Sequence, residues 1–349
     1  MKFPLQRLLL PFAIVSLIIG LWAGLIRIGW DFSWTAMAPY HGALMIGSFL
    51  GTLIILERAI TLKSNWVMLA PLINVLSLPL FLSGYIDAAL FCLIAGGSGM
   101  TLIFIIISYR HPNLYNYLLL SGALCYLAGN IVLNETRLFP NAYPWWMAFF
   151  FLTIIGERVE LSRFLNISKH KQYLLTGFLG LFVIGILFPF HGPGRYILAI
   201  SLAASAIWLL KYDMALKSVK STGQFRFTGS LLLIGYMWLL ITAVMAFFVS
   251  SSLWTYDAFL HSFFLGFVFA MIFAHAPIIL PPVLAINKKI YHPILFIWFG
   301  LLQVSLITRI ISDFLENAFC QRWSGLFNGI AILLFFVNVL VLLKFGNRK

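Results

Sequence analysis

Apolar residues along the chain form long runs, each about the 20 residues that an α-helix needs to cross a bilayer. Short polar segments with turn residues, such as His111-Pro112 and His191-Gly192-Pro193-Gly194, separate these runs. The pattern predicts an all-α integral membrane protein with twelve transmembrane helices. The predicted spans are residues 8–28, 39–60, 66–84, 86–108, 114–134, 144–163, 173–190, 193–211, 227–250, 257–280, 291–312 and 323–344.

The composition agrees with this pattern. Of the 349 residues, 62% are hydrophobic and only 9% are charged, whereas soluble domains carry roughly 25% charged residues. A soluble enzyme, a disordered regulator and a nucleic-acid-binding protein are therefore excluded. The first apolar run follows a short basic start and lacks a small-residue cleavage signal, so we expect a first membrane span and not a removed signal peptide.

The formal charge is +13, and the distribution of the basic residues among the predicted loops indicates the orientation of the chain in the membrane. If the N-terminus is cytoplasmic, the cytoplasmic side holds all but a few of the 23 basic residues. The exceptions are Arg27, Arg137, Arg195, Arg309 and Arg322. Cytoplasmic loops of membrane proteins carry an excess of Lys and Arg, so this segregation supports twelve spans with both termini cytoplasmic. The same charges favour contact with anionic lipid headgroups.

Predicted spans two, six and ten share positional features. Spans two and ten have His41 and His261 near their outer ends, and spans two and six end in Glu57-Arg58 and Glu157-Arg158 at the inner side. Each of these spans comes four spans after the one before it, which indicates an internal repeat. We therefore expect one transmembrane domain over residues 1–349, built from four-helix units at about 1–112, 113–225 and 226–349.

His41 and His261 are the strongest candidates for chemistry, because ionisable residues inside a membrane are costly and usually functional. Both lie about one turn from the outer interface on helices that run in the same direction. Two neutral imidazoles on facing helices are what an axial haem site requires. The alternative is that each histidine is an interfacial side chain bonded to a carbonyl group or to water.

A second candidate group lies toward the inner side. His275 is 14 residues after His261, about 21 Å further along a helix, so the two cannot ligate the same metal. Its depth matches that of Glu57 and Glu157, and the three could bind a metal, the edge of a second haem or protons. The alternative is that Glu57-Arg58 and Glu157-Arg158 are interfacial ion pairs.

Arg309 lies near the outer end of predicted span eleven, four residues before Asp313. This spacing predicts pairing along one helix face, while a nearby haem would offer Arg309 a propionate instead. Cys92, Cys125 and Cys320 form no CxxC pattern, and the sequence contains no P-loop, GxSxG, HExxH or CxxCH. Phosphoryl transfer, acyl transfer, zinc proteolysis and c-type haem attachment thus have no support.

Twelve spans in three parallel four-helix units, with histidines on spans two and ten, resemble the heme-copper oxidase subunit I superfamily. The segments HGALMIGSFLG and HSFFLGFVFAMIFAH also resemble the NnrS family, membrane haem proteins tied to the nitric oxide response of denitrifying bacteria. The resemblance implies haem b, one group or two, with His41 and His261 as axial ligands of the low-spin haem. It also implies a multi-pass protein of the bacterial cytoplasmic (inner) membrane.

The sequence departs from the oxidase pattern where copper would bind. That family takes copper ligands from its sixth and seventh helices, but the outer half of span six reads WWMAFFF and span seven contains no histidine. The HxH of the tenth helix is also missing, since residue 259 is phenylalanine. Copper therefore lacks oxidase-type ligands here, and a dioxygen-reducing binuclear centre is not expected.

Together these features predict a haem-binding integral membrane protein that senses, binds or detoxifies nitric oxide or another small diatomic, or that passes electrons. The sequence leaves open whether it is an enzyme. A twelve-span transporter or metal-handling permease that uses Glu57, Glu157 and His275 is the alternative. Expected partners are membrane lipid, no nucleic acid, and either a respiratory-chain subunit or further copies of the chain.

Overall fold

The computed structural model describes residues 6–62, 64–165, 167–249, 252–286 and 290–345. These residues are almost entirely helical, and no β-strand occurs among them. The predicted all-α class is therefore confirmed. The chain divides between Glu157 and Arg158 into two compact units, and each is described by itself. The predicted division into three four-helix units stays a prediction.

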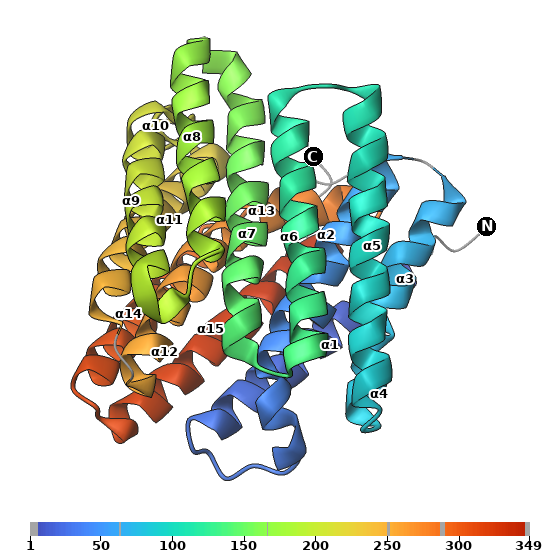
Figure 1. Ribbon diagram of the computed structural model, residues 1–349, viewed down its shortest axis with the longest axis vertical. Helices are drawn as coiled ribbons and strands as arrows, with labels where there is room; N and C mark the ends of the chain where they lie inside the picture. The colour runs from blue at the N-terminus through green and yellow to red at the C-terminus, as the bar shows by residue number, and fades with distance from the viewer. Residues whose placement is uncertain (1–5, 63, 166, 250–251, 287–289, 346–349) are drawn as a thin grey trace. The chain divides into compact units, whose positions relative to one another are not determined.

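In the first unit, α5 and α6 lie side by side (Figure 1), and α3 and α4 pack against α5. The α1 helix packs against η1 and η2, which lead into α2. The helices are α1 Gln6–Arg27, η1 Thr35–Tyr40, η2 Ala43–Gly51, α2 Thr52–Thr61, η3 Asn65–Met68, α3 Leu69–Val75, α4 Ser77–Leu82, α5 Ile86–Arg110, α6 Leu114–Thr136 and α7 Phe139–Ser162, which contains the unit boundary.

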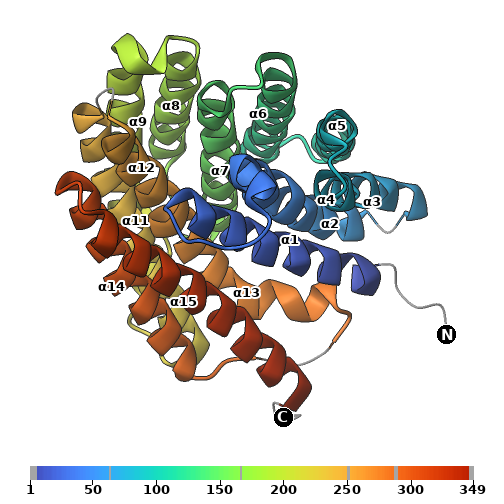
Figure 2. The same cartoon turned by 90° about the horizontal axis from the view of Figure 1, so that it is seen from below.

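In the second unit, α14 and α15 lie side by side (Figure 2), and α9 packs against both α8 and α11. A continuous helical segment, α12 with η6 and α13, packs against α11 and α14. The helices are η4 Arg163–Leu165, α8 Lys169–Ile186, η5 Phe190–Gly194, α9 Arg195–Tyr212, α10 Ala215–Ser218, α11 Gly223–Phe248, α12 Leu253–His261, η6 Ser262–Val268, α13 Phe269–Val283, α14 Ile294–Phe314 and α15 Ala318–Phe345.

Every one of the twelve predicted spans coincides with a helical segment. Within the described residues, ten of these segments are long and apolar enough to cross a membrane, as an α-helical multi-pass membrane protein requires. The other two are α7 and α8. Prolines and an asparagine occupy the first turns of α7, and the first turn of α8 reads Lys-His-Lys-Gln, so part of each helix is polar.

The α7 and α8 helices are consecutive, so the predicted orientation of the other spans does not depend on whether this pair crosses the membrane. Removing one span reverses the direction of every later span, but removing two consecutive spans reverses none. The predicted orientation of the ten apolar segments is therefore the same with or without α7 and α8 as spans. Only the basic residues of the α7–α8 connection would change sides.

Three of the described helical segments have the wider π-helical geometry, η2 in the first unit and η5 and η6 in the second, although Gly192 interrupts η5 with non-helical backbone angles. Segments of this kind are rare and are frequent at functional sites. In η2, the carbonyl group of Gly47 accepts hydrogen bonds from Asn74 Nδ2 (3.0 Å) and the Tyr126 hydroxyl (3.2 Å). Asn74 and Tyr126 are fully buried and also bond to each other, at 3.1 Å. A buried polar network thus stabilises the π-helical geometry.

A first prediction concerns Gly51, the last residue of η2. A Cβ atom at this position would lie 2.2 Å from the Tyr126 hydroxyl oxygen, which is closer than real contacts allow. Gly51→Ala therefore displaces Tyr126 from its bonds to Gly47 and Asn74. We expect a loss of about 1–3 kcal/mol of unfolding free energy, measured by denaturation in detergent micelles.

Gly300→Ala is the matched control for Gly51→Ala. Gly300 lies inside α14, and no atom lies within 4 Å of the position that its Cβ would take. We expect this variant to be as stable as the parent protein or slightly more stable, because alanine has the higher helix propensity. Equal stability of both variants would contradict the role given to the Tyr126 contact.

Candidate functional site

His41 follows η1 and comes two residues before η2, and helix α1 positions its ring. The Nδ1 atom lies 2.7 Å from the carbonyl oxygen of Gly20. A carbonyl oxygen only accepts hydrogen bonds, so Nδ1 carries the proton and Nε2 keeps the lone pair of the neutral ring. A Cβ atom at Gly24 would lie 2.8 Å from Cε1 of the ring. The small residues of α1 thus make room for the imidazole and fix its tautomer.

His261 is the last residue of α12 and directly precedes η6. Its Nδ1 atom lies 2.9 Å from the backbone carbonyl oxygen of Asp257 and 3.2 Å from the side-chain oxygen Oδ1 of the same residue. Both oxygens accept, so Nδ1 again carries the proton and Nε2 the lone pair. In the described part of the chain, no hydrogen-bond partner reaches Nε2.

Arg309 of α14 holds the carboxylate that orients His261. Its Nε and Nη2 atoms donate to Oδ2 of Asp257 at 3.1 and 2.9 Å, and the Arg309 side chain is almost completely buried. The spacing in the sequence predicts pairing with Asp313, but the hydrogen-bonding partner of Arg309 is Asp257. A tertiary contact between α12 and α14 thus replaces the expected contact along one helix.

The polar cluster extends from Arg309 to α15. Asp313 is fully buried, and its Oδ1 atom accepts a hydrogen bond from Gln321 Nε2 at 2.7 Å. The other oxygen of Asp313 has no hydrogen-bond partner among the described residues. Neither Asp257 nor Gln321 is among the candidate residues that the sequence identifies. The four-residue spacing of Asp257 and His261 is a signal that could have identified the pair.

His41 and His261 share a local arrangement. Each ring donates from Nδ1 to an acceptor of the protein, and each residue lies directly before or two residues before a π-helical segment. Histidines that bind metals almost always donate the other ring N–H to a carboxylate or a carbonyl group, which sets the tautomer and raises ligand basicity. Both imidazoles therefore have the chemistry of a metal ligand that binds through Nε2.

The candidates toward the predicted inner side, Glu57, Glu157 and His275, interact with arginine side chains. In the first unit, Arg58 hydrogen-bonds to Glu157 and lies 3.8 Å from Glu57. In the second unit, Nη2 of Arg158 lies 3.0 Å from Nε2 of His275.

The bonding of His275 differs from that of His41 and His261. Nδ1 of His275 lies 2.7 Å from the Met271 carbonyl oxygen, so Nδ1 carries the proton and Nε2 accepts from Arg158. Within either unit, the described residues contain no group of three or more His, Cys, Asp or Glu residues that could hold a metal. A joint metal or ion site of Glu57, Glu157 and His275 stays a prediction.

Comparison with known proteins gives one family. A family model described as "Domain of unknown function (DUF8744)" matches residues 6–344, nearly the whole chain. No curated protein and no solved structure matches the chain.

Proposed function

The chain belongs to the family described as Domain of unknown function (DUF8744), and we propose that it is a haem-binding membrane protein with His41 and His261 as axial ligands. The observation that carries this proposal is the shared bonding of the two rings, in which Nδ1 donates and Nε2 keeps its lone pair. Scarcity of ionisable groups in the spans supports it further, because such groups are retained in membranes mainly for function.

The residues of the second unit would hold the ligand in a defined orientation. Asp257 fixes the ring of His261 and strengthens it as a donor to iron, and Arg309 fixes Asp257. We therefore assign Arg309 a positioning role instead of a contact with a haem propionate. In the first unit, the Gly20 carbonyl and the space above Gly24 play the corresponding role for His41.

A bound haem b would supply a redox-active iron that passes single electrons, or that binds a small diatomic in place of one of the two histidines. The resemblance of the two histidine segments to the NnrS family favours nitric oxide as the ligand and the nitric oxide response as the setting. We propose no copper, because no oxidase-type copper ligands are present in the sequence.

For the topology, we propose twelve spans with both termini on the cytoplasmic side of a bacterial inner membrane. The segregation of basic residues supports this orientation. The α7 and α8 helices would then cross the membrane as a pair, with their polar first turns near opposite interfaces.

The test is the absorption spectrum of the full-length protein purified from cells with abundant haem. We expect a Soret band, the α and β bands of a low-spin haem after reduction, and close to one haem for each chain. Nitric oxide added to the reduced protein should shift the Soret band if the protein binds the gas, whereas a protein that only passes electrons would keep its spectrum. A purified, folded protein without a Soret band would contradict the proposal.

A further inference from the structure

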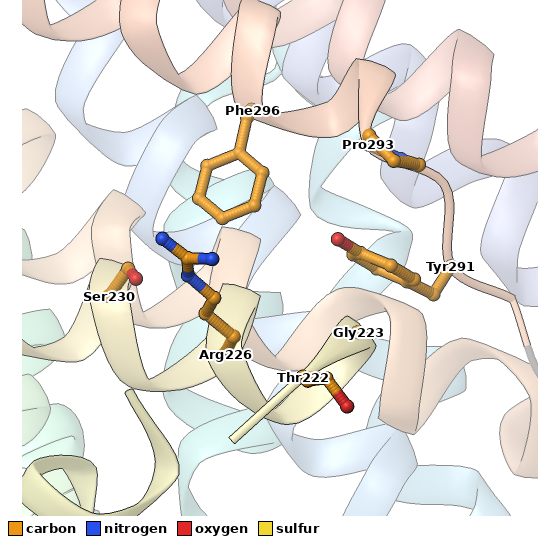
Figure 3. A pocket seen from close by; sticks show the side chains of 7 residues that line it. All are labelled: Thr222, Gly223, Arg226, Ser230, Tyr291, Pro293 and Phe296. Atoms are coloured by element: carbon orange, nitrogen blue, oxygen red, sulfur yellow. The ribbon is translucent and has the colours of Figure 1, made fainter. Parts of the chain in front are cut away.

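A pocket of about 410 Å³ lies in the second unit, where α11 and α14 both begin (Figure 3). This volume is within the range of roughly 300–1,000 Å³ that small-molecule sites occupy. Arg226 and Ser230 line it from α11, while Tyr291 and Phe296 line it from the start of α14 and the residues before it. Neither His41 nor His261 lines the pocket, and binding there does not depend on haem.

Local packing explains the shape of the pocket. Gly223 starts α11 with a φ of +60°, a conformation that favours glycine. Phe227 is fully buried, and its ring packs against Tyr291 at 5.9 Å and against Phe296 at 4.9 Å between ring centroids. The two aromatic walls of the pocket are thus held by one buried side chain, and Arg226 lies directly beside it in the sequence.

The charge inside the pocket is not balanced. Arg226 has no hydrogen-bond or ion-pair partner among the described residues, and the first turn of α11 contains no acidic residue. Figure 3 shows the Arg226 guanidinium group and the Tyr291 hydroxyl group pointing toward the same space beside the Phe296 ring. Ser230 lies one helical turn after Arg226, so its hydroxyl group is on the same face of α11.

These groups have the chemistry that binds phosphate. A guanidinium group donates two parallel hydrogen bonds to phosphate oxygens, and hydroxyl groups supply further donors. The backbone N–H groups at the start of a helix also favour an anion. The walls formed by Phe296 and Pro293 are apolar, so the pocket suits a phosphate attached to an apolar group better than free phosphate.

The place of the pocket in the chain points to the source of that phosphate. Two apolar segments long enough to cross a membrane, Gly223–Phe248 and Ile294–Phe314, both begin at the pocket. Phe225, beside Arg226, is 71% exposed, as aromatic residues at a membrane interface often are. We propose that this pocket binds the phosphate group of an anionic phospholipid headgroup.

The experiment is native mass spectrometry of the full-length protein in neutral detergent, titrated with phosphatidylglycerol and, separately, with phosphatidylcholine. We expect preferential binding of phosphatidylglycerol by the parent protein. Arg226→Gln should weaken it about tenfold, the effect of losing a hydrogen bond to a charged group. Arg226→Lys keeps the positive charge but loses the paired guanidinium donors. Its affinity for phosphatidylglycerol should therefore lie between that of the parent protein and that of Arg226→Gln.

Arg110→Gln is the matched control. Arg110 is an exposed residue at the end of α5 and does not line the pocket. Its replacement by glutamine removes one positive charge on the predicted cytoplasmic side, where Arg226 is also expected. We expect this variant to bind phosphatidylglycerol like the parent protein. Equal loss in both glutamine variants would show attraction by general charge and would overturn the proposal, as would unchanged binding by Arg226→Gln.

Competition with inorganic phosphate distinguishes a lipid headgroup from free phosphate as the ligand of the pocket. Millimolar phosphate should displace phosphatidylglycerol only weakly if the headgroup and its apolar attachment both contribute to binding. Complete displacement by phosphate, together with no preference over phosphatidylcholine, would assign the pocket to free phosphate and overturn the lipid proposal. Thermal unfolding of each variant checks that the exposed substitutions leave the fold intact.

Discussion

Replacing His261 with alanine is expected to remove the low-spin haem spectrum from the purified protein, and His41→Ala should do the same. Each variant removes one axial ligand, and with it the imidazole whose Nδ1 proton is already committed to Asp257 or to the Gly20 carbonyl. Loss of a supporting hydrogen bond alone costs about 10- to 100-fold in metal affinity. Loss of the ligand itself should cost more, and haem content should fall accordingly.

His292→Ala is the matched control for the two ligand variants. His292 is exposed before α14, and its Nδ1 atom accepts a hydrogen bond from the backbone N–H of Ile294 at 3.2 Å. We expect this variant to keep the full spectrum. Added free imidazole should restore a low-spin spectrum to His261→Ala, which a purely structural role of the residue would not allow.

The outcome that contradicts this prediction is clear. Unchanged spectra in both His41→Ala and His261→Ala would show that neither residue is an axial ligand. If a haem is still present in that case, other residues hold it, and the proposed assignment of the site would be wrong.

The helices could be predicted from the sequence because burial in a bilayer demands long apolar runs. Their internal geometry could not. The π-helical form of η2 depends on hydrogen bonds that Asn74 and Tyr126 make to the Gly47 carbonyl. These residues come from α3 and α6 and approach η2 only after the chain has folded, so no local pattern records them.

The two histidines of the candidate site could be predicted from the sequence, but the groups that orient them could not. His41 and His261 could be selected because imidazoles are rare in apolar segments. Their acceptors were not selected, since a backbone carbonyl such as that of Gly20 carries no sequence signal. Asp257 carries one, because it is one helical turn before His261. The same four-residue spacing predicts that Arg309 pairs with Asp313, whereas Arg309 donates to Asp257 on another helix.

Replacing Arg309 with methionine is expected to destabilise the second unit by about 3–5 kcal/mol, the range for breaking a buried ion pair by removing one partner. Arg309 is 6% exposed and donates twice to Asp257, while the fully buried Asp313 lies in the same cluster. The variant leaves two carboxyl groups without their cation, that of Asp257, whose side chain is 26% exposed, and that of the buried Asp313. Unfolding in mixed micelles, followed by circular dichroism, measures the loss.

Arg137→Met provides the comparison for Arg309→Met, because Arg137 also pairs with an aspartate on the predicted outer side. That pair, with Asp87 at 2.7 Å, is exposed, with 47% and 88% of the two side chains accessible. Exposed pairs contribute about 0–1 kcal/mol, so little change is expected. In Arg309→Met combined with Asp257→Asn, part of the lost stability should return, since one unpaired carboxylate is gone. Equal, small losses in the two methionine variants would refute the argument that burial makes the Arg309–Asp257 pair structurally essential.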